Sequence, residues 1–212
     1  MHINKNSLRR SLSVACAGGA LLLSGPGLAH EGHDQAEHAA ANAAAAGTSD
    51  YKRTQQSYAI PDLVLIDADS RPVKLRELLA TKDPVMMNFI FTTCTAICPV
   101  MTKIFSEVPA KLGAEAGKVR MISISIDPEN DRPAQLKSYA KGYGAGERWT
   151  FLTGKVEDIK AVQRAFDNYR GDKMNHEPVT LLRAAPGKPW VRIDGFASPA
   201  ALAGEYRKVV LQ

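Results

Sequence analysis

The apolar run "PVMMNFIF" at residues 84–91 constrains the fold more than any other feature of the chain. Its eight residues match the length of a strand, and apolar side chains at nearly every position indicate a strand buried on both faces of a sheet. A helical pattern, "PVMTKIFSEVPAKLGAEAG", begins at residue 99, so a helix follows this strand closely. A buried strand that leads into a helix is typical of α/β folds.

The same alternation of strands and helices continues along the chain. "KVRMISISID" at 118–127 predicts a second buried strand, and the residues after it predict a helix with Asp131 as its N-cap. The other expected elements are two strands around a turn and a short helix at 58–79, a strand at 149–154, a helix at 155–169, a hairpin around Pro186–Gly187 and a final helix from Ser198. Together they predict a single α/β domain, a thioredoxin-like sandwich with a central mixed sheet flanked by helices.

The first 29 residues differ from the rest and predict a secretory signal peptide. Lys5, Arg9 and Arg10 precede a short apolar run, which ends in small residues up to Ala29. We expect cleavage after Ala29 and a periplasmic or otherwise exported protein; the alternative is an uncleaved membrane anchor. The segment 30–54 is rich in Ala and His and has few large apolar side chains. It is therefore expected to be a mobile tail, and the folded domain is expected at residues 55–212.

The net charge does not favour a nucleic-acid partner once the signal peptide is removed. The full chain has 27 Lys and Arg against 22 Asp and Glu. Residues 1–29 hold three of the basic residues and none of the acidic ones, so 24 remain against 22 and the mature charge is about +2. The remaining sequence has no basic stripe, and we expect it to bind no nucleic acid.

Two cysteines remain after Cys16 is lost with the signal peptide, and both lie where the buried strand meets its helix. Helix N-termini stabilise anions, so a thiolate of Cys94 or Cys98 is expected to have a lowered pKa. In an exported protein such a pair is a structural disulfide, a redox couple or a metal site. Helical residues four apart have Cβ atoms about 5–6 Å apart, whereas a disulfide needs roughly 3.5–4.5 Å. A disulfide therefore requires Cys94 to lie in the loop before the helix, and two thiolates on one metal accept the wider spacing.

His176 is the single histidine of the expected domain, and it comes immediately before the apolar run of the hairpin. It is either a structural histidine or a ligand, and the loop that carries it is expected to face the cysteines. Asp127, at the end of the second buried strand, either approaches the same site or serves the turn before Pro128. Met101 and Met174 lie near these residues in the sequence and are expected to be packing residues.

These features together resemble the Sco (SenC) family of copper chaperones. The resemblance covers about residues 55–212 and rests on the C-x-x-x-C-P motif in "FIFTTCTAICPVM", on "SISIDPENDRP" and on His176. It implies one copper ion per chain, bound by Cys94, Cys98 and His176 and delivered to the dinuclear copper site of cytochrome c oxidase. It also implies a partner, either the copper-bearing oxidase subunit or another exported copper protein, and proximity to a membrane. Asn175 departs from the family, in which many members have an aspartate before the histidine.

The donor chemistry agrees with copper as the metal. Two thiolates and one imidazole suit Cu(I), whereas zinc prefers a fourth ligand and the expected domain has no other Cys or His. The leading hypothesis is therefore a metallochaperone rather than an enzyme. The alternative is a dithiol–disulfide oxidoreductase that uses the two cysteines to reduce an exported copper protein. In the tail, His30, His33 and His38 either capture Cu(II) or have no metal role.

Overall fold

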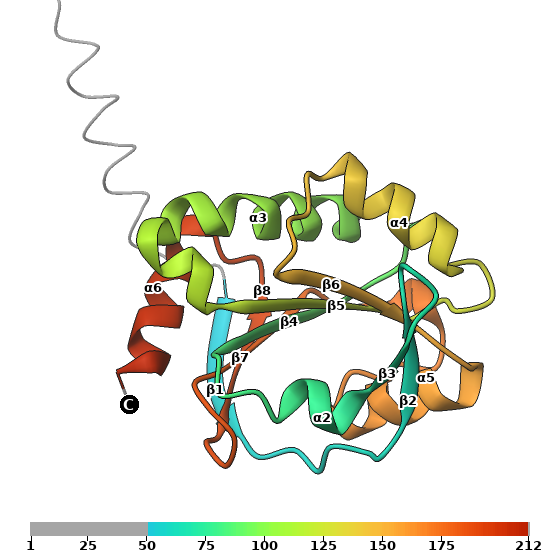
Figure 1. Ribbon diagram of the computed structural model, residues 1–212, viewed down its shortest axis with the longest axis horizontal. Coiled ribbons are helices and arrows are strands. Elements are labelled where there is room, and N and C mark those ends of the chain that lie inside the picture. The colour runs from blue at the N-terminus through green and yellow to red at the C-terminus, as the bar shows by residue number, and fades with distance from the viewer. Residues whose placement is uncertain (1–50, 212) are drawn as a thin grey trace, which may run out of the picture. The chain divides into compact units, whose positions relative to one another are not determined.

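The computed structural model describes residues 51–211, which form an eight-stranded mixed sheet with helices on both faces (Figure 1). The expected signal peptide and most of the expected tail lie outside these residues. The strands are β1 (Tyr51–Gln56), β2 (Val64–Asp67), β3 (Pro72–Lys74), β4 (Val85–Ile90), β5 (Arg120–Ser125), β6 (Trp149–Thr153), β7 (Val179–Arg183) and β8 (Trp190–Gly195). The helices are α2 (Leu75–Leu79), α3 (Ile97–Leu112), α4 (Pro133–Gly142), α5 (Val156–Ala165) and α6 (Pro199–Val210), with 3₁₀ turns η2 (Gly113–Lys118) and η3 (Lys173–Asn175). This arrangement confirms the expected α/β sandwich.

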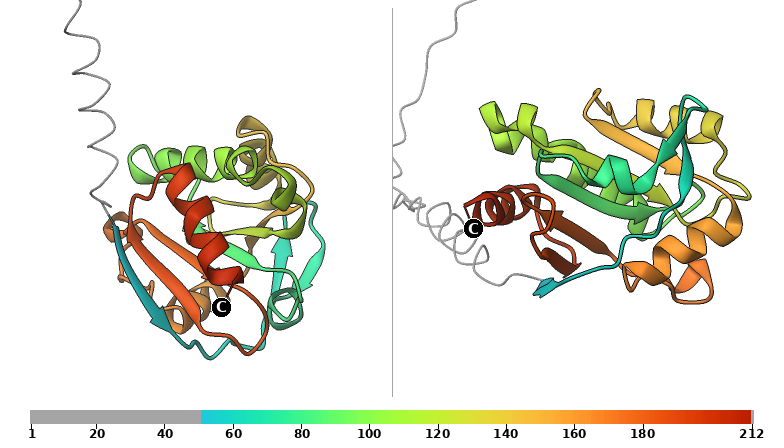
Figure 2. Two further views of the ribbon diagram at one scale, coloured as in Figure 1. Left: turned by 90° about the vertical axis from the view of Figure 1, so that its left-hand side faces the viewer. Right: turned by 60° about the horizontal axis from the view of Figure 1, so that its bottom comes forward.

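The order of strands in the sheet is β1-β8-β7-β4-β5-β6-β2-β3, which places β4 and β5 near the centre. β4, β5 and β6 run parallel to one another, whereas the strands on either side of them are antiparallel to their neighbours. All six residues of β4 are buried, as its continuous apolar run predicts. Helices α3 and α4 lie on one face of the sheet and α2 and α5 on the other, while α6 packs against α3 and β7 (Figures 1 and 2).

Among the described residues, positions 51–54 lie before the expected domain boundary at residue 55. Residues 51–54, expected in the tail, form the start of β1, which pairs with β8 along its whole length. Its sequence "YKRTQQ" has no apolar run, so tertiary pairing rather than local pattern produces the strand. Glu205 of α6 secures it, because its buried carboxylate accepts hydrogen bonds from Tyr51 Oη and Arg53 Nε.

Pro109 lies inside α3 and does not end it. The helix continues to Leu112, and Gly113, with φ at 60°, follows it. Phe105, Val108 and Leu112 of this helix are buried, so burial against the sheet outweighs the local cost of the proline. Cys98 and Met101 near the start of α3 are buried as well, so its N-terminus is also packed against the core.

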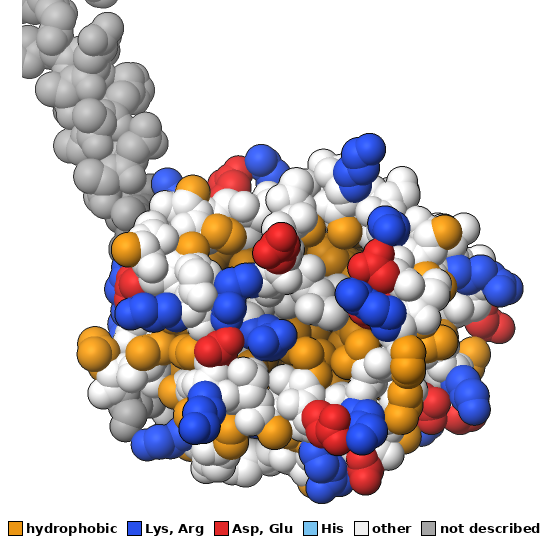
Figure 3. All heavy atoms as spheres, in the orientation of Figure 1, with side chains coloured by type: hydrophobic (Ala, Val, Ile, Leu, Met, Phe, Trp, Pro, Cys, Tyr) orange, Lys and Arg blue, Asp and Glu red, His pale blue; other side chains and the backbone are white. Residues whose placement is uncertain are grey.

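Basic and acidic side chains are interspersed on the face of the molecule shown in Figure 3, with apolar side chains between them. This face therefore presents no large field of a single sign. Between residues 51 and 211, no helix has both the length and the apolar composition that a membrane span requires.

Candidate metal centre

The two cysteines lie at the carboxyl end of β4, in and just after a segment that we call the cysteine loop (residues 91–96). Cys94 is in this loop, half-buried, and Cys98 is in the first turn of α3, fully buried. Both are free thiols. The Cys94 amide donates to Phe91 O at 3.2 Å, which turns the loop toward the helix. Cys94 thus has the loop position that the sequence analysis required for a disulfide, and this position also suits a metal ligand.

The helix N-terminus stabilises the thiolate of Cys94. Its sulfur accepts a hydrogen bond from the Cys98 amide at 3.4 Å. Burial raises the pKa of the Cys94 thiol, but the backbone amides of Cys98, Ala96 and Ile97 outweigh it and hold the pKa below its ordinary value. The lowered pKa expected at this position is confirmed for Cys94.

Cys98 behaves in the opposite way, so the expectation of a lowered pKa is wrong for this residue. Burial raises the pKa of its thiol far above the ordinary value, and the Phe91 amide, which donates to its sulfur at 3.5 Å, offsets only part of this effect. The pair therefore consists of one accessible, acidic thiol and one buried thiol that holds its proton.

His176 follows η3 in a segment that we call the histidine loop (residues 167–178), and it is 9% exposed. Its Nε2 lies 3.0 Å from Phe89 O. A carbonyl oxygen only accepts, so Nε2 carries the proton and Nδ1 has the free lone pair. Nδ1 is buried and has no hydrogen-bond partner among residues 51–211. Burial also lowers the pKa of His176. The ring is therefore a neutral imidazole with one unused nitrogen, which is the form that binds metals.

The three expected ligands are brought to the same strand end but not into ligating geometry. The Cys98 amide donates a hydrogen bond to the Cys94 sulfur. His176 Nε2 is hydrogen-bonded to Phe89 O of β4, and the His176 ring makes an edge-to-face contact with Phe91 at 6.4 Å between ring centroids. In the described part of the chain, no three His, Cys, Asp or Glu side chains lie close enough together to hold a metal ion. Binding a metal here requires side-chain rotation or movement of one of the two loops.

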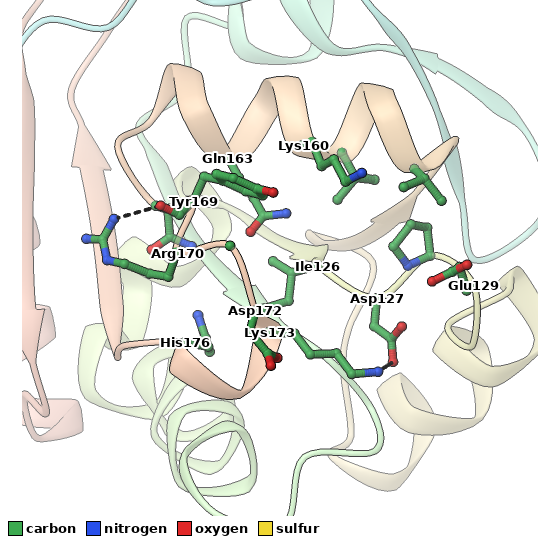
Figure 4. A pocket seen from close by; sticks show the side chains of 15 residues that line it. Ile126, Asp127, Glu129, Lys160, Gln163, Tyr169, Arg170, Asp172, Lys173 and His176 are labelled. Carbon is green, nitrogen blue, oxygen red and sulfur yellow. Dashed lines mark hydrogen bonds and ion pairs between the residues drawn. The ribbon is translucent and has the colours of Figure 1, made fainter.

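Asp127 reaches the histidine loop through Lys173. It is buried, and its carboxylate pairs with Lys173 Nζ at 2.6 Å. Figure 4 shows Asp127 and Lys173 pointing toward each other, with His176 on the other side of Lys173. The Asp127 carbonyl also accepts from the amides of Asn130 and Asp131, so the residue serves the turn as well. The turn interpretation is therefore confirmed, and a role of Asp127 beside the metal site stays a prediction.

A pocket of about 440 Å³ opens beside His176 (Figure 4). Acidic and basic side chains alternate around it, including Asp127, Glu129, Lys160 and Lys173. The two cysteines are not among its lining residues. The pocket therefore approaches the candidate centre from the histidine side.

Two residues near the site differ from the sequence analysis. Met101 is buried, as expected of a packing residue, but Met174 is 73% exposed, so the packing interpretation is wrong for Met174. Asp131 is not the N-cap of α4: that position is Arg132, and Asp131 accepts hydrogen bonds from Thr92 in the cysteine loop instead. The "SISIDPENDRP" motif contained Asp131, but a contact across 39 positions has no local signal.

Comparison with known proteins decides the family. The SCO1/SenC family model matches residues 51–211. The chain belongs to the SCO1/SenC family. The SCO1 protein homolog of Bacillus subtilis is 40% identical over 140 residues, which cover 62% of this SCO1/SenC chain and 72% of that protein.

Two solved structures of Sco proteins share the fold. Bradyrhizobium japonicum ScoI, solved with copper bound, is 26% identical with a TM-score of 0.58, covering 71% of this chain and 99% of that one. BsSco, described as a cytochrome c oxidase assembly protein with a disulfide switch, is 29% identical with a TM-score of 0.63, covering 74% and 96%. These likenesses confirm the thioredoxin-like fold of the Sco proteins.

Proposed function

We propose that this SCO1/SenC protein is a metallochaperone that binds one copper ion per chain through Cys94, Cys98 and His176. The observation that carries the proposal is the His176 ring, whose Nδ1 is buried without a partner while Nε2 is held by Phe89 O. A buried nitrogen without a partner costs about 1–3 kcal/mol, and a metal ion at Nδ1 would satisfy it. ScoI of Bradyrhizobium japonicum, a structural relative, is solved with copper bound.

The donor set fits a soft metal that is bound and then released. Two sulfurs and one imidazole suit copper. Cys94 is the sulfur that loses its proton readily, whereas Cys98 must give up a strongly held proton when the metal arrives. Copper uptake therefore releases a proton from Cys98, and protonation of the same thiol assists release. A centre that is not assembled in advance is suited to transfer, because a partner's ligands can replace its ligands one at a time.

We propose Asp127 as the residue that holds the histidine loop in place. Its ion pair with Lys173 fixes the 3₁₀ turn that comes immediately before His176. Residues that support metal ligands in this way commonly change metal affinity by about 10- to 100-fold when replaced.

The recipient that we propose is the dinuclear copper site of cytochrome c oxidase, on its copper-bearing subunit, during oxidase assembly. BsSco, a relative at 29% identity, is described as a member of a family of oxidase assembly proteins. Delivery of copper to that site agrees with an exported protein. Residues 1–29 have the charged start, apolar middle and small-residue end of a signal peptide. We therefore propose a periplasmic or exported protein that is cleaved after Ala29 and acts close to a membrane.

The second candidate function is dithiol–disulfide exchange, which the asymmetry of the two thiols favours. The Cys94 thiolate would attack a partner's disulfide, forming a mixed disulfide and releasing one partner thiolate. Cys98 would then attack Cys94, transferring its proton to the second partner sulfur. The partner gains two electrons and becomes a dithiol once its first thiolate takes a proton from water, and this chain is left with a Cys94–Cys98 disulfide.

One pair of variants distinguishes the two functions. His176→Ala removes the imidazole and keeps both thiols, whereas Cys98→Ser removes one thiol and keeps the imidazole. Anaerobic copper titration and reduction of a model disulfide are measured on each. For a chaperone, both variants lose tight copper. If His176→Ala keeps full copper affinity, His176 is not a ligand and the three-ligand proposal fails.

A further inference from the structure

Asp131 is a fully buried carboxylate that is bonded to the cysteine loop. It is 0% exposed and lies two residues before α4. Its oxygens accept hydrogen bonds from the Thr92 amide at 3.2 and 3.0 Å, from Thr92 Oγ1 at 2.5 Å and from Ser125 Oγ at 2.6 Å. Three donors, one amide shared between the two oxygens and two hydroxyls, all donate to this carboxylate, which is the pattern of an ionised group.

These hydrogen bonds hold the backbone next to both sulfurs. Thr92 is two residues before Cys94 in the cysteine loop. The preceding amide, that of Phe91, donates to the Cys98 sulfur. The Phe91 amide is thus hydrogen-bonded to the Cys98 sulfur, and the next amide, that of Thr92, is hydrogen-bonded to Asp131. A shift of the Asp131 carboxylate therefore shifts the loop on which the cysteines depend.

The charge of Asp131 is not neutralised by a direct ion pair. Its hydrogen-bond donors, Thr92 and Ser125, are both neutral. Among residues 51–211, no Lys or Arg nitrogen lies within 4.0 Å of it, whereas neighbouring Asp127 pairs with Lys173. The charge also lies near the cysteines, because Asp131 is hydrogen-bonded to Thr92 and the amide of the preceding residue, Phe91, donates to the Cys98 sulfur.

We infer that Asp131 is a positioning residue of the copper centre, which fixes the cysteine loop through Thr92 and favours Cu(II) over Cu(I) through its negative charge. This inference rests on the proposed copper site. Cu(II) carries one more positive charge than Cu(I) and is attracted more strongly by a buried anion. Through a medium with an effective dielectric constant of about 20, one unit of charge at close range changes the ratio of the two affinities by about tenfold or more.

The test is the midpoint potential of copper bound to the full chain, followed through thiolate-to-Cu(II) absorption in a mediated anaerobic titration. Asp131→Asn removes the charge and should raise the potential by about 59 mV, which is a tenfold change in the affinity ratio for one electron. Thr92→Val keeps the charge and removes one hydrogen bond of the loop. It should weaken binding of both oxidation states severalfold and leave the potential unchanged. Asp67→Asn, a buried carboxylate on β2, is the matched control and should change neither quantity.

The outcomes separate the inference from the proposed function. An unchanged potential in Asp131→Asn, or unchanged copper affinity in Thr92→Val, overturns the inference while the copper site stands. If Asp131→Asn does not fold, the Thr92→Val result decides the positioning role alone. Failure of the wild-type chain to bind copper overturns the proposed function, and the inference with it.

Discussion

The two thiols of the reduced protein should differ strongly in their rates of alkylation. Cys94 is half-buried with a lowered pKa, and Cys98 is fully buried with a raised pKa. Each tenfold difference between the two acid dissociation constants, one pKa unit, lowers the thiolate fraction of Cys98 about tenfold relative to that of Cys94. The Cys98 thiolate is the more basic of the two and is intrinsically more nucleophilic. This offsets about half of the loss in its reaction rate on a logarithmic scale. Each unit therefore slows Cys98 by about threefold, before restricted access is counted.

We expect Cys94 to react with iodoacetamide at neutral pH at least about tenfold faster than Cys98. Mass spectrometry of peptides from timed samples measures both rates in one tube, with metal and oxygen excluded. In the Cys98→Ser variant Cys94 should keep most of its rate, and in denaturant the two rates should become equal. Similar rates for the two thiols in the folded protein would refute the electrostatic asymmetry at the helix N-terminus.

Two further predictions concern the loops and the sheet edge. Asp127→Asn should weaken copper binding by about tenfold because the histidine loop loses its ion pair, and Lys173→Met should have the same effect. The double variant should bind no more weakly than either single variant. Additive losses of affinity in a competition titration would show that the ion pair is not the cause. Burial raises the pKa of Glu205, but hydrogen bonds from Lys208 and Arg53 outweigh it and lower the pKa. Its contribution to stability is therefore present above the unfolded-state pKa of about 4.3 and is lost as pH falls through the lower folded-state value. Urea unfolding should show a difference between wild type and Glu205→Gln that shrinks from about pH 5 to pH 3, and a constant difference would disprove this assignment.

The centre of the fold could be predicted from the sequence because its signals are local. The continuous apolar run of β4 and the similar pattern of β5 identify strands that are buried on both faces. The cysteines at the strand–helix junction located the candidate centre for the same reason, since such junctions collect at one edge of a parallel sheet. The position of His176 before a buried strand made it a ligand candidate, and the family resemblance, confirmed by the match to residues 51–211, implied copper as the metal.

Two of the missed features depend on contacts between distant parts of the chain, and the third depends on the path of a loop. β1 is polar and becomes a strand by pairing with β8, which is more than 130 residues away in the sequence. Asp131 precedes a helix and resembles an N-cap, yet its side chain is bonded to Thr92. The exposure of Met174 depends on the path of the histidine loop, which has no periodic pattern. Local propensity carries no information on such contacts.

The copper ligands themselves can be measured by X-ray absorption on the reduced chain loaded with one equivalent of copper under anaerobic conditions. We predict two sulfur scatterers and one imidazole nitrogen in the wild-type protein, with the nitrogen lost in His176→Ala. A copper ion with nitrogen and oxygen neighbours alone, or the same spectrum in both proteins, would place the metal elsewhere and refute the Cys94–Cys98–His176 centre.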